Sequence, residues 1–246
     1  MDSKPSISII TATFNAAEHL PNLIASLRAQ TSKDFEWVVA DGASSDGTLK
    51  ILSEVKDLNL IVSSQPDFGI YDALNRAIKL ASSRYYIVIG ADDFFYEKTI
   101  AIIMNELNTF QELDLLVGQV ELEGELIKIR YGQKFLYGAR AYVASHSVGC
   151  VFNKDLHIKH GYYVNKYPIL ADTYFIKSIF SDKLLRVKYS QEVYGSFSSS
   201  GISSNNKLRT QCEFAQIQLS TERFKYLQTL IFFLRLIKTL LKNNND

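Results

Sequence analysis

The chain has 246 residues, of which 47% are hydrophobic, so it is long enough to bury a core and to form one or at most two domains. Its 27 basic and 26 acidic side chains nearly cancel, which leaves no global field for a polyanion and argues against nucleic acid as a partner. No run of 18 uninterrupted apolar residues is present, and the N-terminal apolar run has strand length without a signal-peptide cleavage pattern. We therefore expect a globular, cytoplasmic protein.

Short apolar runs alternate with segments of helical periodicity in the first half of the chain. The expected strands are Ser6–Thr11, Phe35–Ala40, Leu58–Ser63 and Tyr85–Ile89, and the expected helices are Glu18–Gln30, Ser45–Val55, Gly69–Ala81 and Lys98–Leu107. Repeated strand–helix units with short connections predict an α/β fold with a mostly parallel sheet and helices on both faces. Ligands of such sheets bind beyond the carboxyl ends of the strands.

The second half is less regular. We expect a hairpin from Leu113–Val120 and Glu125–Tyr131, strands at Ser147–Phe152 and Leu184–Tyr189, a helix at Ile169–Phe180, and loops at Tyr131–Tyr142 and Val193–Asn206. His157 and His160 are three residues apart, but no third ligand is evident. They are therefore predicted to be surface residues rather than a metal site.

Carboxylates follow two of the predicted strands. Asp92 and Asp93 are adjacent, and their mutual repulsion needs an offset such as a divalent cation, which would also bind phosphate oxygens. The alternative is that one of them caps the following helix. Asp41 follows the second strand, where its carboxylate can accept from the base or ribose of a nucleotide, whereas Asp46 is interpreted as a helix cap.

The segment Pro66–Asn75 forms a turn that opens a helix. Asp67 either caps this helix or holds a donor ribose, and Arg76 either meets phosphate or lies on a solvated helix face. We count Asn75 and Arg76 among the candidate donor-binding residues. No P-loop, no GxGxxG after the first strand and no GxSxG elbow is present, which removes the main support for kinase, dinucleotide-oxidoreductase and serine-hydrolase chemistry.

Three segments, in this order, resemble glycosyltransferase family 2, which has the GT-A nucleotide-diphospho-sugar transferase fold. They are ISIITATFNAAEHL, FEWVVADGASSDGT and SSQPDFGIYDALNRAIKLASSRYYIVIGADD. The resemblance is close over about the first 110 residues and extends more weakly through His146 and Asp172 to Gly201–Ser203. It implies a nucleoside diphosphate sugar as donor and a divalent metal, Mn²⁺ or Mg²⁺, as cofactor.

The resemblance also implies roles for single residues. Thr11, Thr13 and Asn15 would line the nucleotide pocket, Asp41 would bind the base, Asp67 and Asp92 would face the ribose or donor sugar, and Asp93 would hold the metal. The family's metal motif is Asp-any-Asp, often loosened to any-Asp-Asp, and Ala91 leaves only the loosened form here.

The acceptor side offers two candidates. Asp172 matches the general base that similar enzymes carry on a helix, and an inverting transfer needs such a base near the acceptor hydroxyl. The competing interpretation is a carboxylate that faces solvent. His146 falls where relatives keep a polar residue near the acceptor, although a lone histidine is more often structural.

The C-terminal stretch from Phe224 to Lys242 is broadly apolar. Its basic residues Lys225, Arg235 and Lys238 are placed, with Lys242, to share one side, which predicts an interfacial helix on an anionic membrane. The alternative is a helix packed on the catalytic domain. We expect a GT-A domain at 1–220, with a nucleotide-sugar half at 1–110 and an acceptor half at 111–220, followed by an amphipathic helix at 221–246.

Together these features predict transfer of a sugar from a uridine diphosphate sugar to an acceptor hydroxyl, and the resemblance implies inversion at the anomeric carbon. The acceptor would be a saccharide or lipid-linked saccharide of a bacterial surface polysaccharide, at the cytoplasmic face of the inner membrane. One alternative is a non-catalytic nucleotide-sugar-binding or scaffold protein. A sugar nucleotidyltransferase is disfavoured because Thr11–Asn15 offers no Gly-rich phosphate loop.

Overall fold

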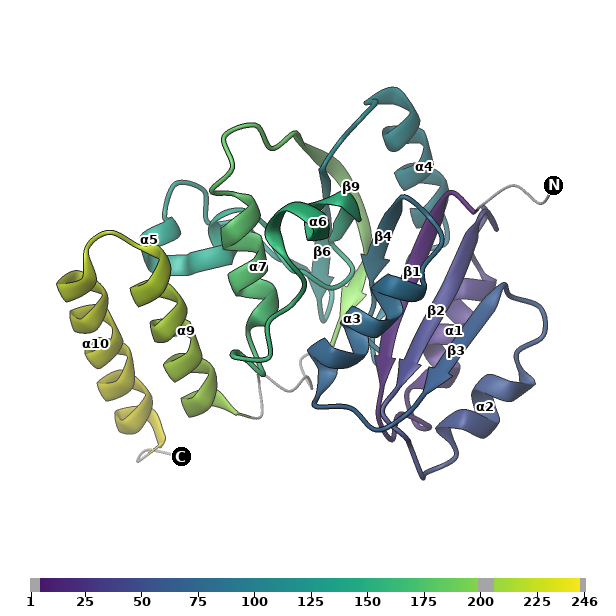
Figure 1. Ribbon diagram of the computed structural model, residues 1–246, viewed down its shortest axis with the longest axis horizontal. Coiled ribbons are helices and arrows are strands. Elements are labelled where there is room, and N and C mark those ends of the chain that lie inside the picture. Colours follow the sequence, from purple (N-terminus) through teal and green to yellow (C-terminus); the bar gives the residue numbers. More distant parts are fainter. Residues whose placement is uncertain (1–4, 199–205, 244–246) are drawn as a thin grey trace.

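The computed structural model describes residues 5–198 and 206–243, whose strands form one curled sheet with helices on both sides (Figure 1). The strands are β1 (Ile7–Thr13), β2 (Phe35–Asp41), β3 (Leu60–Ser64), β4 (Tyr85–Val88), β5 (Phe94–Phe95), β6 (Leu115–Leu122), β7 (Glu125–Leu126), β8 (Cys150–Asn153) and β9 (Val187–Phe197). The helices are α1 (Leu20–Arg28), α2 (Thr48–Glu54), α3 (Ile70–Leu80), α4 (Thr99–Thr109), α5 (Lys134–Tyr137), α6 (Asp155–His160), α7 (Ala171–Ile179), α9 (Lys207–Thr221) and α10 (Lys225–Asn243), with a 3₁₀ turn at Gly138–Ala141.

The strand order is β3-β2-β1-β4-β8-β6-β9-β5, and β7 pairs with β6. The first four strands of this order run parallel, so their carboxyl ends meet at one edge. β8 then pairs antiparallel with both β4 and β6, and β9 runs parallel to β6. β8 therefore joins the two halves of the sheet, β3-β2-β1-β4 on one side and β6-β9-β5 on the other.

Apolar residues fill both faces of the sheet, as the buried runs of β1 and β2 require. On one face, α1, α2 and α4 pack over a core that includes Trp37. On the other face, α3 and α7 pack over a core that contains Tyr71, Phe152 and Phe175. This second core joins the two halves of the protein next to the site described below.

The predicted strands and helices of the first half are confirmed, with boundaries that move by a few residues. In the second half, the expected loop at Val193–Asn206 is wrong for its first part, because β9 continues to Phe197 between β6 and β5. Gly195 explains the misleading composition, since a Cβ there would lie 2.2 Å from the carbonyl oxygen of Phe94. A residue with a side chain would push β5 away.

Two further expectations need correction. The segment Tyr131–Tyr142 is not entirely loop, because it contains α5 and the 3₁₀ turn. The second strand of the predicted hairpin is only the two residues of β7. Local composition failed here because tertiary contacts with α7 and α9 define the segment. The stretch Gly201–Ser203 lies outside the described residues.

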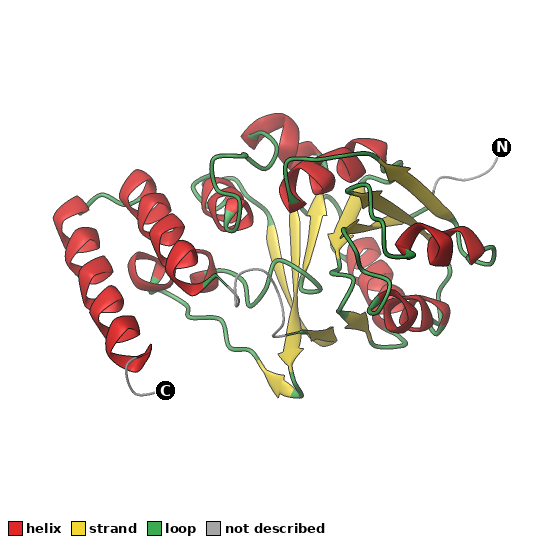
Figure 2. Ribbon diagram, turned by 90° about the horizontal axis from the view of Figure 1, so that it is seen from below, coloured by secondary structure: helices red, strands yellow, loops and turns green. Residues whose placement is uncertain are grey.

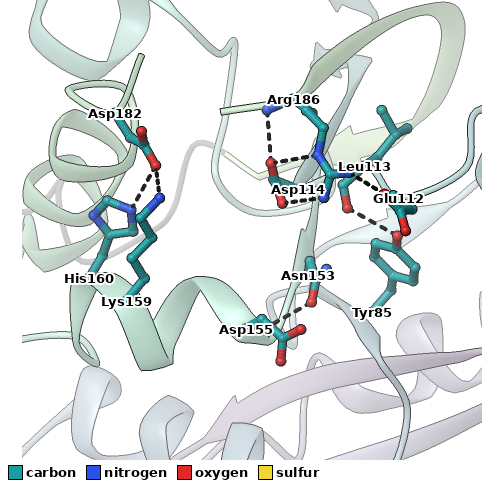
Figure 3. Close-up of polar contacts among 10 residues, drawn as sticks. All are labelled: Tyr85, Glu112, Leu113, Asp114, Asn153, Asp155, Lys159, His160, Asp182 and Arg186. Atoms are coloured by element: carbon teal, nitrogen blue, oxygen red, sulfur yellow. Dashed lines mark hydrogen bonds and ion pairs between the residues drawn. The ribbon is translucent and has the colours of Figure 1, made fainter. Parts of the chain in front are cut away.

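His157 is not a surface residue. It is 3% exposed, its Nδ1 lies 3.0 Å from the carbonyl oxygen of Gly161, and burial lowers its pKa to about 4. His160 is half-buried at the end of α6, where Lys159 forms an ion pair with Asp182 beside it (Figure 3). The two histidines thus stabilise the packing of α6, and neither belongs to a group of three or more metal-binding side chains within the described ranges.

Helices α9 and α10 lie side by side at the end of the molecule opposite β2 and β3 (Figure 2). Of the basic residues expected to share one outer side, Lys225 and Lys238 are exposed but Arg235 is not. Arg235 turns inward, where its guanidinium lies 4.8 Å from the ring centre of Phe214 and donates to the carbonyl oxygen of Leu136. The exposed side also carries apolar residues, namely Tyr226, Leu227, Leu230, Phe233, Leu234 and Ile237. Within the described ranges, none of the helices is long and apolar enough to cross a membrane.

Candidate active site

The carboxyl ends of β1 and β2 meet around Asp41. Its carboxylate accepts hydrogen bonds from the Thr13 hydroxyl (3.0 Å), the Ser64 hydroxyl (2.7 Å) and both the backbone N–H (2.9 Å) and the hydroxyl (2.5 Å) of Ser44. Burial acts to raise the pKa of Asp41, but these hydrogen bonds outweigh it and hold the pKa below its ordinary value. Asp41 is therefore ionised, and it organises the loop after β2.

Asn15 holds the same loop from the other side. Its carboxamide oxygen accepts a hydrogen bond from the backbone N–H of Ser45 (3.0 Å), and the backbone N–H of Asn15 donates to the Ser44 hydroxyl (2.8 Å). Thr11, in contrast, is fully buried and accepts from the indole of Trp37 (3.0 Å). Thr13 and Asn15 thus order the loop at the expected nucleotide pocket, whereas Thr11 is a core residue beneath the sheet surface that contacts Trp37.

Arg76 reaches this loop from α3. One terminal nitrogen donates to the carbonyl oxygen of Asp41 (2.7 Å), so Arg76 does not lie on a solvated helix face. Its Nε and other terminal nitrogen are buried and have no hydrogen-bond partner among the described residues. Unsatisfied buried donors of a cation are costly, and an acceptor-rich ligand would satisfy them.

Asn75, next to Arg76, has a different role. Its carboxamide donates to the carbonyl oxygen of Tyr163 (2.8 Å) and accepts from the backbone N–H of the same residue (3.0 Å). This pairing fastens α3 to the chain before α7. It engages the polar atoms that a donor contact would need, so Asn75 is a packing residue in this structure.

Asp67 lies beside the loop of Asp41. A Cβ built on Gly42 would lie 2.8 Å from Asp67 Oδ2, which shows how closely the carboxylate approaches that loop. Its Oδ1 accepts from the backbone N–H of Gly69 (2.9 Å). Gly69 is the N-cap of α3, so Asp67 orders the turn before the helix with one oxygen and faces the Asp41 loop with the other.

Asp92 and Asp93 converge over Gly90, beyond the end of β4. A Cβ on Gly90 would lie 2.9 Å from Asp92 Oδ1 and 2.8 Å from Asp93 Oδ2, so only glycine leaves this space free. Asp93 accepts from the N–H of Gly90 (2.9 Å), the Ser147 hydroxyl (2.7 Å) and the N–H of Ser198 (3.0 Å). Burial, with the charge of Asp92, still raises the pKa of Asp93.

These two carboxylates fit a hard divalent cation. They supply oxygen ligands that repel each other without a counter-charge, and a cation such as Mg²⁺ binds proteins through one or two carboxylates and completes its sphere with water and phosphate. No third acidic, histidine or cysteine side chain joins them within the described part of the chain.

Asp172 stands in the first turn of α7, on the opposite side of the same space. Its Oδ1 accepts from the Tyr71 hydroxyl (2.8 Å) and from the backbone N–H of Thr173 (2.7 Å). Tyr71 comes from α3, so a residue of the first half orients the carboxylate of the second. Asp172 is partly exposed, and it lines the same cavity as Asp92 and Asp93.

His146 is 8% exposed, and its Nε2 contacts the Tyr163 hydroxyl. A buried chain of hydrogen bonds continues from Tyr163 to the Tyr86 hydroxyl (3.2 Å) and on to His157 Nε2 (2.7 Å). Burial lowers the pKa of His146, against the opposing charge of Asp172. His146 is therefore a neutral imidazole, fixed in orientation at the wall of the cavity.

One cavity of about 340 Å³ collects the central groups. It is lined by Asp92 and Asp93 at one end and by His146, Ile169 and Asp172 at the other. The structure thus brings together four of the predicted site residues, Asp92, Asp93, His146 and Asp172, which are up to 80 positions apart in the sequence. Thr11, Thr13, Asn15, Asp41, Asp67, Asn75 and Arg76 lie outside its lining.

Comparison with known proteins decides the family. The model of glycosyl transferase family 2 matches residues 8–152, more than half of the chain. A PGL/p-HBAD biosynthesis glycosyltransferase of Mycobacterium bovis (strain BCG / Pasteur 1173P2) is 32% identical over 206 residues, which cover 82% of this chain and 80% of the relative. The chain belongs to glycosyltransferase family 2. It is a glycosyltransferase, as predicted.

Other members of the family and its fold support this assignment. The Escherichia coli protein UDP-Glc:alpha-D-GlcNAc-diphosphoundecaprenol beta-1,3-glucosyltransferase WfaP is 31% identical over 90 residues, 36% of each chain. TarS residues 1–349 of S. aureus, solved with UDP-GlcNAc, superimpose with a TM-score of 0.69 at 20% identity, over 92% of this chain and 70% of that one. Mannosyltransferase PcManGT of Pyrobaculum calidifontis, solved with GDP-Man and Mn²⁺, gives 0.67 at 17% identity, over 88% and 64%. The fold is GT-A.

Several residues of this glycosyltransferase site escaped the sequence analysis. Tyr71 lies inside the GIYDALNRA motif that carried the resemblance, but its contact with Asp172 spans 101 positions. Ser147 and Ser64, which donate to Asp93 and Asp41, are ordinary serines in the sequence. Their only signal was proximity to strand ends and to His146.

Proposed function

We propose that this family 2 glycosyltransferase transfers a sugar from a uridine diphosphate sugar to an acceptor hydroxyl with inversion at the anomeric carbon. The observation that carries the proposal is the single cavity between the Asp92–Asp93 pair and Asp172. Such a cavity lets a donor diphosphate lie at one end and an acceptor hydroxyl at the other.

On the donor side, Asp41, Asp67 and Arg76 surround the ends of β2 and β3, where a nucleoside would bind. A ligand at Asp41 would replace the serine hydroxyls that now occupy its carboxylate. Uridine is favoured because TarS was solved with UDP-GlcNAc and WfaP is named for UDP-Glc.

Asp92 and Asp93 would hold Mn²⁺ or Mg²⁺, as the Mn²⁺ complex of PcManGT suggests. A bound divalent cation would neutralise the charge that develops on the leaving diphosphate. The chain itself contributes the two carboxylates and the hydrogen bonds from Ser147 and Gly90 that fix one of them.

Asp172 would act as the general base. The acceptor oxygen forms a bond to the anomeric carbon while the bond from that carbon to the diphosphate oxygen breaks, and the hydroxyl proton passes to Asp172. Tyr71 and the N–H of Thr173 hold the carboxylate through Oδ1, which leaves Oδ2 for the proton. The neutral imidazole of His146 would contact the acceptor from the cavity lining.

For the acceptor, we propose a saccharide or lipid-linked saccharide of a bacterial surface glycan. Two relatives support this class, since one is named for PGL/p-HBAD biosynthesis and WfaP for a diphosphoundecaprenol-linked acceptor. The exposed apolar side of α10 supports peripheral binding at the cytoplasmic face of a membrane, with no spanning helix required.

The test is calorimetric titration of the protein with UDP, GDP, ADP and CDP, each with and without Mn²⁺. We expect UDP to bind in a metal-dependent way, and Asp93→Ala to lose the metal-dependent part. Binding of UDP-sugar without transfer to any acceptor would favour the non-catalytic alternative. Absence of binding by every nucleotide would overturn the proposal.

A further inference from the structure

A second cavity, also of about 340 Å³, lies between α7, α9 and α10, away from the donor end. Its lining is mainly apolar and includes Leu170, Phe214, Ala215, Ile231 and Phe232. Its volume is in the range of ~300–1,000 Å³ that small-molecule pockets occupy. The reaction at Asp172 does not by itself need this space.

A third cavity, of about 320 Å³, is named the connecting cavity here because it shares lining residues with both the apolar pocket and the catalytic cavity. At one end it is lined by His146 and Asp172, which also line the catalytic cavity. At the other end it is lined by Arg140 and Thr173, which also line the apolar pocket. The connecting cavity therefore lies next to each of the other two, and Asp172 lines both the catalytic and the connecting cavity.

Polar contacts hold the walls of the apolar pocket, and they involve the lining residues Gln228 and Arg235 as well as Lys177 and Glu222. Gln228 of α10 donates to the carbonyl oxygen of Phe135 (2.9 Å), and Lys177 of α7 forms a buried ion pair with Glu222 after α9 (2.5 Å). Arg235 adds its contact with Phe214. These contacts fix α10 against the domain, so the pocket is preformed and does not depend on a ligand.

Arg140 stands where the connecting cavity meets the apolar pocket. It is exposed, and it forms no ion pair with any residue in the described ranges. An unpaired cation between a catalytic carboxylate and an apolar pocket suits an anionic group of a ligand, and guanidinium matches phosphate geometry.

We propose that the acceptor is amphipathic and that its apolar aglycone binds in the pocket between α7, α9 and α10. A phosphate-type linker lies at Arg140, and the saccharide hydroxyl reaches Asp172 through the connecting cavity. This inference rests on the proposed function, because it takes Asp172 as the reacting end. It assigns the acceptor subsite to particular residues of this chain.

Decyl phosphate, kept below its micelle concentration, is the probe, and calorimetric titration measures its affinity. Ile231→Trp fills the pocket, and Ala215→Met fills it from the facing helix. Ile237→Trp is the matched control, because it makes the same change on the outer side of α10, where Ile237 is 52% exposed. Arg140→Gln tests the linker, and inorganic phosphate tests whether the apolar part is needed.

We expect decyl phosphate to bind wild type and Ile237→Trp alike, and to bind Ile231→Trp, Ala215→Met and Arg140→Gln at least about tenfold more weakly. Equal affinity in folded Ile231→Trp and wild type, no binding to wild type, or loss only in Ile237→Trp would overturn the inference. UDP with Mn²⁺ is titrated into the same samples. If UDP binds but decyl phosphate does not, only the proposed acceptor subsite is contradicted. If UDP does not bind to wild type, the proposed function is contradicted.

Discussion

The phenolic hydroxyl of Tyr71 lies 2.8 Å from Oδ1 of Asp172 and 2.8 Å from the carbonyl oxygen of Ile169. Burial, together with the charge of Asp172, raises the pKa of Tyr71 far above its ordinary value, so the hydroxyl stays protonated and donates. Tyr71 belongs to α3 and Asp172 to α7. A helix of the donor half thus orients the proposed base of the acceptor half.

Replacing Tyr71 by Phe should release that carboxylate without opening the core. We expect kcat for transfer to fall roughly 10- to 150-fold, which corresponds to the ~1.5–3 kcal/mol of a lost hydrogen bond to a charged group, while KM for the donor stays unchanged. Steady-state kinetics with varied donor at saturating acceptor measure the two parameters separately.

Tyr85→Phe is the matched control for this change. Tyr85 is also buried, and its hydroxyl also donates to a backbone carbonyl, that of Leu113 (3.0 Å; Figure 3), but Tyr85 does not line the catalytic cavity. A purely structural effect would lower the melting temperature of both variants and kcat of both alike. Equal kcat values in the two variants would contradict the positioning role of Tyr71.

Asp172→Asn should abolish transfer and keep donor binding. The amide has the same shape and accepts the same hydrogen bond from Tyr71, but it cannot take the acceptor proton. Loss of general base catalysis costs ~10²–10⁴-fold in rate. Transfer assays, with nucleotide titrations on the same sample, measure both properties.

Asp155→Asn serves as its control, because Asp155 is an exposed carboxylate in the first turn of another helix, α6. That variant should transfer sugar at the wild-type rate. If Asp172→Asn retained more than a few per cent of activity, the base would have to be another group. His146 would be the first candidate among the cavity-lining side chains.

How far the sequence could go is clear from Asp41, Asp92 and Asp93. Each follows a strand of strong apolar character, so strand periodicity alone placed all three at the carboxyl edge of the sheet, as the structure confirms. The parallel half of the fold followed from the same local patterns. What each carboxylate binds stays a prediction, because a position at a strand end indicates a binding site but does not identify the ligand.

The sequence could not reveal what depends on contacts over long separations. Asn75 resembled a donor ligand in its motif, yet the chain folds Tyr163 back onto it and engages its amide. His157 was expected at the surface because no third metal ligand was evident near it, but Tyr86 and Phe175 contact it in the core. The second part of β9, from Val193, was mistaken for a loop because of its glycine and serines, and its strand conformation is supported by pairing with β6 and β5.

The stability gained from divalent cation should rise with pH. Burial and the charge of Asp92 raise the pKa of Asp93, so just above the ordinary carboxyl pKa of ~3.9 the folded state keeps a proton that the unfolded state has lost. Stability therefore falls as pH rises through this window. A cation needs the ionised form, so its stabilising effect grows over the same window.

Thermal unfolding from pH 4.5 to pH 8 checks this, with a UDP-sugar present and with or without Mn²⁺. We expect the increment in melting temperature from Mn²⁺ to increase with pH in wild type. In Asp93→Asn it should be small and independent of pH. The same increment at every pH in wild type would show that Asp93 does not bind the cation.

The exposed side of α10 should bind membranes through its apolar side chains. Leu230 and Phe233 are 56% and 53% exposed on a helix whose inner side already packs on the domain, so their burial in a lipid interface costs no internal contact. Each would gain ~1.5–3 kcal/mol if fully buried. Replacing both by Gln should reduce co-sedimentation with vesicles of anionic phospholipid at least tenfold.

Ile158→Gln with Leu184→Gln is the matched control, because these side chains are 85% and 80% exposed but lie outside α10. If general stickiness caused sedimentation, both double variants would lose it. If α10 is the contact, only Leu230→Gln with Phe233→Gln does so. Since Leu230 and Phe233 lie outside the lining of the pocket between α7, α9 and α10, decyl phosphate should still bind the variant in which both are replaced by Gln. Membrane binding and acceptor binding are then separable properties of one helix, with lipid on its outer side and the aglycone on its inner side.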